Sequence, residues 1–326
     1  MTPRRKIIPL FIPHAGCPHS CVFCNQHRIA GSGAATLDDV RAAATIAKTE
    51  VNATEIAFYG GSFTALPVHV QNEFLAAAQP FEIRISTRPD CIDEEICERL
   101  KSFGVATVEL GAQSMCDDVL GHSRRGHIAS DVFKAAKIIK DAGLSLILQM
   151  MTGLPGDAPD TSRYTAEKFI EIAPDGVRIY PAVVVRGTEL FDMWRHGDYR
   201  EHTVEDAVNL CAELCAMFDA AGIPIIRLGL NPTEALSSGD AAAGAYHPAF
   251  GELVYSRMYL DKAIKKLEEI PSDSDVILHV AKNRVSVMTG QHRANVDALK
   301  QKFTAMSIRI VGTDLLPEEI KVEILT

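Results

Sequence analysis

The sequence predicts an α/β protein built around a parallel β-sheet. Short runs rich in β-branched residues alternate with helical patterns up to about residue 230, which is the rhythm of repeated strand-helix units. Several expected strands are apolar at consecutive positions, as parallel strands buried on both faces are. Gly104, Gly143 and Gly222 follow helical patterns, where glycine commonly ends a helix. Six or seven such units fit a closed or open parallel barrel, and a doubly wound sheet is the alternative.

The expected elements can be placed in order along the chain. We expect strands over residues 8–14, 54–60, 82–88, 107–113, 145–153, 176–184 and 223–230. We expect helices over residues 36–50, 67–78, 93–104, 129–143, 162–173 and 204–222. The segment 231–251 is rich in Gly, Ala, Pro and Ser and predicts a long loop able to close over a site, before a helix over 252–269. The remaining residues predict a small ββαββ module, with strands at VILHV, RVSVMTG, SIRIVG and IKVEI and a helix at NVDALKQKF.

The composition is that of a globular protein large enough for one α/β core and an appendage. The chain has 326 residues, of which 47% are hydrophobic and 23% are charged. Its formal net charge of −9 argues against a protein that holds nucleic acid by bulk positive charge, although it allows a local basic groove. We predict a main domain over residues 1–265 and a small α+β module over 266–326 that caps it.

The sequence carries no pattern for secretion or membrane insertion. Its first apolar stretch is short, is broken by Pro9 and Pro13, and is followed by no small-residue cleavage site. No window approaches the roughly 18 consecutive apolar residues that a membrane span needs. Three of the eight cysteines crowd into one short segment, which indicates metal in a reducing compartment rather than a disulfide scaffold. We therefore expect a cytoplasmic protein.

The crowded cysteines follow the first expected strand directly. The string GCPHSCVFCNQ places Cys17, Cys21 and Cys24 at CxxxCxxC spacing, at the strand end where a parallel barrel keeps its functional residues. Three thiolates on one tight loop can bind three irons of a cubane cluster and leave the fourth iron open to a substrate or cofactor. The spacing alone leaves two alternatives, a chance cluster or a zinc site completed by His14, His19 or His27.

Small and polar residues recur at the ends of later strands. Gly60 and Gly61 end the second strand, where missing side chains let the backbone approach a polar ligand. Gln113 follows the fourth strand and can donate and accept hydrogen bonds, and Arg125 offers planar donors suited to a carboxylate. An ordinary turn or a solvated charge explains any one of them alone, but their recurrence favours a shared site. Two further residues expected to line a cavity are Tyr180 and Arg186.

Five motifs together make the chain similar to the radical S-adenosylmethionine (SAM) superfamily. They are CPHSCVFC, YGGSFTALP, TRPD, VELGAQS with the following RRGH, and MTGLPG. Within the superfamily, the chain resembles the radical SAM domain of the elongator catalytic subunit, a tRNA-uridine modifying enzyme, from about Ile7 to Tyr259. The resemblance implies a partial (β/α)6 TIM-like barrel of the radical SAM type, to which the terminal module adds a small C-terminal α+β extension.

The resemblance also implies cofactors and residue roles. The catalytic and metal-binding residues would be Cys17, Cys21 and Cys24, which hold a 4Fe-4S iron-sulfur cluster whose remaining iron is chelated by SAM. One electron passed to the SAM sulfonium releases a 5′-deoxyadenosyl radical, while the protein orients SAM and substrate and excludes oxygen and water. The implied SAM-binding residues are Gly60, Gly61, Ser62, Ser86, Gln113, Arg125 and Gln149.

Three departures from the relatives limit what the resemblance implies. Many relatives carry Glu at the positions of Ser62 and Ser86, although the elongator-like branch also has a small hydroxyl residue at the first. The elongator subunit continues into an acetyltransferase domain, and nothing after residue 260 resembles one. We therefore predict a radical SAM enzyme, transferase or oxidoreductase, with tRNA modification as the leading hypothesis.

Two alternatives remain beside the leading hypothesis. One is a radical SAM enzyme acting on a tetrapyrrole or another small metabolite, which the acidic net charge favours slightly. The other is a non-catalytic protein that carries a cluster or heme. The expected partners are an electron donor such as flavodoxin or ferredoxin, and tRNA, with no membrane.

Overall fold

The computed structural model describes residues 6–30, 33–49, 53–272 and 274–325. The chain forms two compact units, one of residues 1–204 with 217–248 and one of residues 205–216 with 249–326. The predicted domain boundary after residue 265 stays a prediction. Within the described ranges, no helix is both long and apolar enough to cross a bilayer.

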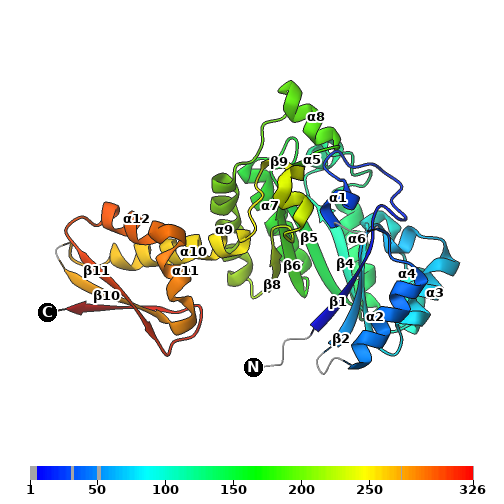
Figure 1. Ribbon diagram of the computed structural model, residues 1–326, viewed down its shortest axis with the longest axis horizontal. Coiled ribbons are helices and arrows are strands. Elements are labelled where there is room, and N and C mark those ends of the chain that lie inside the picture. Colours follow the sequence, from blue (N-terminus) through cyan, green and yellow to red (C-terminus); the bar gives the residue numbers. More distant parts are fainter. Residues whose placement is uncertain (1–5, 31–32, 50–52, 273, 326) are drawn as a thin grey trace. The chain divides into compact units, whose positions relative to one another are not determined.

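The first unit is built on a seven-stranded parallel sheet whose strand order follows the chain. The strands are β1 (Lys6–Ile12), β2 (Ala53–Gly60), β3 (Glu82–Thr87), β4 (Val105–Gln113), β5 (Ser145–Thr152), β6 (Gly176–Pro181) and β8 (Ile225–Leu228). A doubly wound sheet would reverse its strand order at a switch point, so this alternative is wrong. The strands lie side by side in a curved sheet (Figure 1), which confirms the predicted partial barrel.

Helices follow the strands and cover the outer face of the sheet (Figure 1). Five of them are α2 (Leu37–Thr49), α3 (Val68–Ala78), α4 (Glu94–Ser102), α6 (Ala129–Asp141) and α7 (Pro159–Ile172). The Asp93 side chain accepts a hydrogen bond from the Ile96 amide at 2.7 Å, so it satisfies a free amide at the start of α4. The shorter α1 (Gln26–Ala30) and α5 (Asp117–His122) lie in the loops after β1 and β4. The chain continues through α8 (Glu189–His196) and α9 (Val204–Ala220).

The core of this unit lies between the sheet and its helices. The Phe58 ring of β2 stacks on the Phe74 ring of α3, with 5.8 Å between the centroids, and Phe58, Ile85 of β3 and Phe169 of α7 are fully buried. The opposite positions of the same strands face the interior of the barrel. There polar and charged side chains such as Glu109, Gln149 and Arg178 lie beside apolar ones such as Phe11 and Met151, and together they line the site described below.

The segment expected to be one long loop contains regular structure. The strands β7 (Val183–Val185) and β9 (Ala241–Gly244) pair antiparallel, and a short π-helical turn, η3 (Leu236–Asp240), precedes β9. The prediction of a loop over residues 231–251 is therefore wrong in part. At Gly244 the backbone of β9 lies so close to the chain just before β7 that a Cβ would be only 2.9 Å from the carbonyl oxygen of Ala182. The missing side chain of glycine allows this approach.

The second unit contains a three-stranded sheet in the order β11-β10-β12. Its elements are α10 (Phe250–Leu267), β10 (Asp275–Ala281), α11 (Val285–Thr289), α12 (Ala294–Lys302), β11 (Ser307–Thr313) and β12 (Ile320–Leu325). The predicted strand at RVSVMTG is wrong, since this segment forms α11. Its alternating apolar residues suggested a strand, but Val285 and Met288 also have helical spacing, and Met288 is fully buried in the core of this unit.

We expect Phe169→Ala to lower the free energy of unfolding by about 3–5 kcal/mol, because it leaves a cavity in a fully buried position. Urea unfolding of the full chain measures this change. The matched control is Tyr164→Ala on the same helix, where the side chain is 45% exposed, and here we expect a loss below about 1 kcal/mol. Equal losses in the two variants would contradict the described packing of α7.

Candidate active site

The three cysteines lie on a loop that connects β1 to α1. The loop begins with residues in the left-handed region, His14 at φ 55° and Gly16 at φ 72°. The Cys17 amide donates to the His14 carbonyl at 3.2 Å, and the Cys24 amide donates to the Cys21 carbonyl at 3.1 Å. These local turns fold the loop back on itself, so the three thiols stay on one side of the strand ends.

Gln26, at the end of the cysteine loop, forms hydrogen bonds with His14 at the start of the loop and with Gly60 at the end of β2. Its side chain donates to the Gly60 carbonyl at 2.8 Å and accepts a hydrogen bond from the His14 amide. Its own amide donates to His14 Nε2 at 2.9 Å. This nitrogen is therefore occupied, which argues against His14 as a zinc ligand through Nε2. No three His, Cys, Asp or Glu side chains in the described part of the chain are grouped so that they could hold one metal ion.

Gly60 and Gly61 let the cysteine loop lie against the end of β2. Gly60 has φ 100°, a conformation that favours glycine. A Cβ at Gly61 would overlap the Ala15 carbonyl oxygen and lie 2.6 Å from that of Ile12. The Gly61 amide instead donates to the Ile12 carbonyl at 3.0 Å. The glycine pair is thus required by backbone packing, and it also exposes backbone at the cavity.

One cavity of about 370 Å³ opens at this end of the barrel. Eight of the ten residues expected to bind the cluster or SAM line it, namely Cys17, Cys24, Gly60, Gly61, Ser86, Gln113, Arg125 and Gln149. The other two, Cys21 and Ser62, do not line it. Cys21 reaches the site through Arg125, whereas Ser62 is fully buried and its hydroxyl pairs with that of Thr87 at 2.9 Å. Ser62 therefore joins the ends of β2 and β3 in this structure.

Arg125 connects the cysteine loop to β4. Its Nη1 donates to Cys21 Sγ at 3.1 Å, and its Nη2 donates to the Gly111 carbonyl at 2.6 Å. Its Nε is buried and has no hydrogen-bond partner among the described residues. A buried, unpaired donor on a cation is costly, so this nitrogen is an unsatisfied donor in a residue that lines the cavity. Nearby, Gln149 donates to the side-chain oxygen of Gln113 at 3.2 Å.

The thiols are in a setting that suits metal binding after loss of their protons. Burial is the largest cause that raises the pKa of Cys24, to about 12, with the neighbouring thiols adding to it. Burial also raises the pKa of Cys17. Both thiols are thus protonated at neutral pH without metal, and binding of iron would release these protons. A donor set of three thiols on one loop fits a cluster with one open iron.

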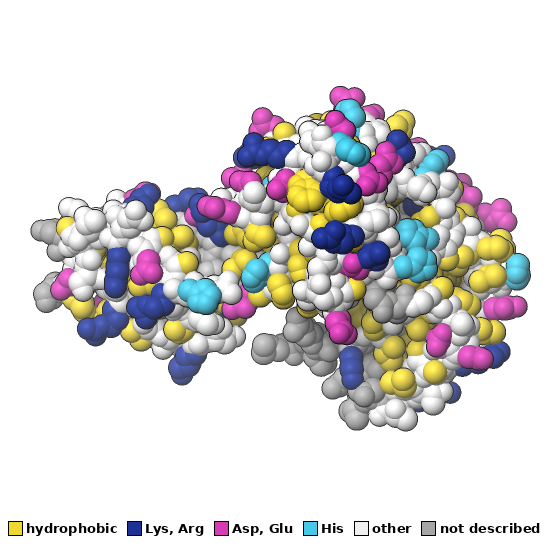
Figure 2. Space-filling model, turned by 45° about the horizontal axis from the view of Figure 1, so that its top comes forward, with side chains coloured by type: hydrophobic (Ala, Val, Ile, Leu, Met, Phe, Trp, Pro, Cys, Tyr) yellow, Lys and Arg dark blue, Asp and Glu magenta, His cyan; other side chains and the backbone are white. Residues whose placement is uncertain are grey.

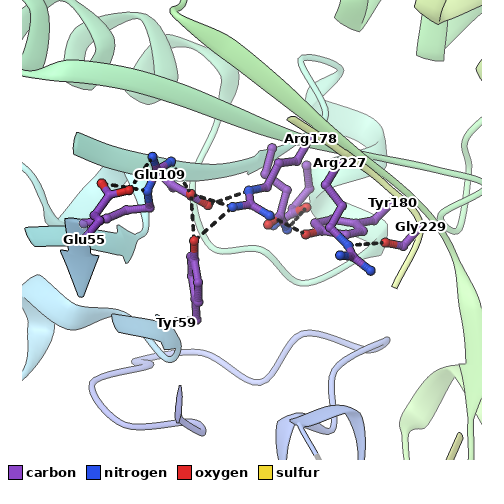
Figure 3. A network of polar contacts seen from close by, with 10 residues as sticks. Glu55, Tyr59, Glu109, Arg178, Tyr180, Arg227 and Gly229 are labelled. Carbon is purple, nitrogen blue, oxygen red and sulfur yellow. Dashed lines mark hydrogen bonds and ion pairs between the residues drawn. The ribbon is translucent and has the colours of Figure 1, made fainter. Parts of the chain in front are cut away.

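A charged network that the sequence analysis missed crosses the barrel interior beside the cavity (Figure 3). Arg84 donates to both carboxylate oxygens of Glu55, at 3.1 and 3.0 Å, and to Glu109 at 2.8 Å. Arg178 contacts Glu109 through Nε and Nη2, each at 2.8 Å, and donates to the Tyr59 hydroxyl at 3.0 Å. A charged residue inside an otherwise apolar strand is the signal that could have revealed it.

The network contributes to one wall of the cavity, which Glu109, Arg178, Tyr59 and Tyr180 all line. Tyr180 was expected to line a cavity, and this prediction is confirmed. Arg186 was expected there as well, but it is exposed and its guanidinium lies over the Phe191 ring, 5.4 Å from the centroid. Burial lowers the pKa of Arg178, but the carboxylate of Glu109 outweighs this and the net effect is a raised pKa, so Arg178 stays charged.

Two family profiles match consecutive parts of the chain. The profile of the Radical SAM superfamily matches residues 11–169, and that of the Radical_SAM C-terminal domain matches residues 174–260. Together they cover about three quarters of the chain.

Curated relatives match over part of their length. The tRNA uridine(34) acetyltransferase of Methanocaldococcus jannaschii is 38% identical over 130 residues, which are 39% of this chain and 24% of that protein. Elongator complex protein 3 of Homo sapiens is 31% identical over 197 residues, which are 51% of this chain and 36% of that protein. The chain therefore matches less than half the length of either relative.

Solved structures share the fold. The archaeal Methanocaldococcus infernus Elp3 with an N-terminal deletion has a TM-score of 0.59 at 22% identity, over 79% of this chain and 63% of that chain. Streptococcus suis SuiB bound to S-adenosylmethionine has a TM-score of 0.52 at 13% identity, over 72% of this chain and 49% of that chain. At these identities the likeness concerns the fold alone.

We expect Glu109→Gln to lower the free energy of unfolding by about 3–5 kcal/mol, because it leaves two buried guanidinium groups without a shared carboxylate. Urea unfolding at neutral pH measures the change. Glu171→Gln is the control, since its carboxylate pairs with Lys168 on the surface and its loss should cost less than about 1 kcal/mol. An unchanged midpoint for Glu109→Gln would contradict the network.

His127 should make stability depend on pH. Burial, aided by Arg125 and Arg88, lowers its pKa to about 4, whereas an unfolded histidine titrates near 6.5. The unfolded chain then binds one more proton between these values, so stability falls as pH drops from about 6.5 towards 4, by at most about 1.4 kcal/mol per pH unit. Urea unfolding across this range should give a shallower decline for His127→Gln. Parallel curves would contradict the lowered pKa.

Proposed function

The chain belongs to the radical SAM superfamily, and on this premise we propose that it is an enzyme that cleaves SAM reductively to initiate radical chemistry. Members of this superfamily use a 4Fe-4S cluster and SAM. When bound, the two together supply a 5′-deoxyadenosyl radical after one electron reaches the SAM sulfonium. The observation that carries the proposal is one cavity, which two of the cysteines line together with six of the seven residues expected to bind SAM.

Different residues at the cavity would bind the cluster and the different parts of SAM. Cys17, Cys21 and Cys24 would hold the cluster and leave one iron open for SAM. Gly60 and Gly61 would let the methionyl part of SAM approach the end of β2. Arg125 lines the cavity, which supports a contact between its guanidinium and the SAM carboxylate.

Further residues of the cavity support binding of the rest of SAM. The hydrogen-bonded amides of Gln113 and Gln149 offer donors and acceptors for the adenosine part. Ser86 lines the same cavity and offers a hydroxyl. The apolar walls keep water from the reacting carbon, and they include Phe11, Phe23, Met151, Val183 and Val185.

We propose tRNA as the substrate, because the curated relatives are a tRNA uridine acetyltransferase and Elongator complex protein 3. The acetyl transfer named for the first relative is not part of the proposal, since the chain matches only 24% of that protein. The face drawn in Figure 2 mixes basic with acidic side chains, so binding of RNA would depend on local contacts. We further propose that the protein lies in the cytoplasm and that it receives its electron from a donor such as flavodoxin or ferredoxin.

We expect anaerobically reconstituted protein with dithionite and SAM to release 5′-deoxyadenosine, and Cys21→Ala to abolish the release. Chromatography with mass detection measures the nucleoside. Cys97→Ala is the control, because Cys97 is buried in α4 and does not line the cavity. Wild-type protein that carries a cluster but releases no nucleoside would overturn the enzyme in favour of a carrier.

The substrate is tested by nucleoside mass spectrometry of tRNA from a deletion strain. A modified nucleoside should disappear, return with the wild-type gene, and stay absent with Cys21→Ala. An unchanged nucleoside profile would overturn the proposal that tRNA is the substrate, and it would favour a tetrapyrrole or another small metabolite. Filter binding of tRNA should weaken steeply with added salt.

A further inference from the structure

Arg125 lies on a turn with a constrained backbone. The flanking residues Arg124 and Gly126 have φ 51° and 74°, and a Cβ at Gly126 would overlap the ring of His19. The Arg125 amide donates to the Leu120 carbonyl at 3.0 Å. The turn thus fixes where the Arg125 side chain leaves the backbone, which matters because this side chain spans from the cysteine loop to β4.

The carbonyl of Arg125 accepts a hydrogen bond from a residue at the end of another strand. Arg88, which directly follows β3, donates to this carbonyl from Nη2 at 2.5 Å. Its Nε and Nη2 also donate to the two carboxylate oxygens of Asp90, each at 2.9 Å. This bidentate pairing fixes the plane of the guanidinium, so Nη2 is aimed at the turn. Arg88 is only 4% exposed, which restricts it further.

We propose that Arg88, oriented by Asp90, is a positioning residue for SAM binding, because it holds the turn that carries Arg125. In this arrangement Asp90 fixes Arg88, Arg88 fixes the Arg125 backbone, and the Arg125 guanidinium stays between Cys21 and Gly111. The inference rests on the proposed function, in which Arg125 binds SAM. It gives the TRPD motif a physical task that its sequence alone does not reveal.

The geometry requires an arginine at this position. A planar guanidinium can chelate a carboxylate through two nitrogens and still donate to a carbonyl in the same plane. A lysine ammonium keeps the charge near Asp90 but is a single point donor, so it cannot hold both partners in fixed directions. Arg88→Lys therefore removes the positioning and preserves the charge.

The test measures SAM binding directly. We expect Arg88→Lys to raise the Kd for SAM about tenfold or more, by equilibrium dialysis of the anaerobic cluster-loaded protein. The change that SAM causes in the electron paramagnetic resonance spectrum of the reduced cluster should also weaken. The control is Arg257→Lys on α10, since Arg257 pairs with Asp261 and donates to Asn209 but does not line the cavity. Here the Kd should stay within about twofold of wild type.

A double-mutant cycle separates positioning from direct contact. If Arg88 acts through Arg125, Arg88→Lys combined with Arg125→Lys should bind SAM no more weakly than Arg125→Lys alone. Full addition of the two effects, or an unchanged Kd for Arg88→Lys, would overturn the inference. Wild-type protein that binds no SAM would instead refute the proposed function. Should Arg88→Lys fail to fold, Asp90→Asn takes its place in the same cycle, with the same expected non-additivity.

Discussion

The site depends on how closely the cysteine loop can approach the end of β2. The Gly61 amide donates to the Ile12 carbonyl, and any Cβ at Gly61 would overlap the backbone at Ala15. Only glycine allows this contact. Once the loop is seated, Gln26 can reach Gly60, and Arg125 can reach Cys21. A requirement of backbone packing thus determines where the thiols face the cavity.

Much of the fold and of the site could be predicted from the sequence, for identifiable reasons. Each strand of the barrel has a clear apolar run, and parallel strands must all end at the same edge of the sheet. Residues such as Cys17, Gly60, Gln113 and Gln149, which are far apart along the chain, therefore meet at one cavity. The motifs identified strand ends, and the topology brought those ends together.

The parts that could not be predicted depend on partners from other strands. The apolar residues beside Glu109 in β4 signal a buried charge, but they do not identify its partners, Arg84 and Arg178, which come from other strands. Ser62 matched a position expected to bind SAM, but Thr87 on the next strand takes its hydroxyl. The residues of α11 have a pattern that is also compatible with a strand. In the structure they form a helix, and Met288 is buried in the core of the second unit.

The hydrogen bonds of Gln26 have a consequence for how the site is loaded. The Gln26 side chain donates to the Gly60 carbonyl and the Gln26 amide donates to His14 Nε2, so contacts within the polypeptide already fix the path of the cysteine loop. A loop that is ordered by folding has less conformational entropy left to lose when a ligand binds. The entropic cost of arranging the loop thus falls on folding rather than on assembly of the cluster.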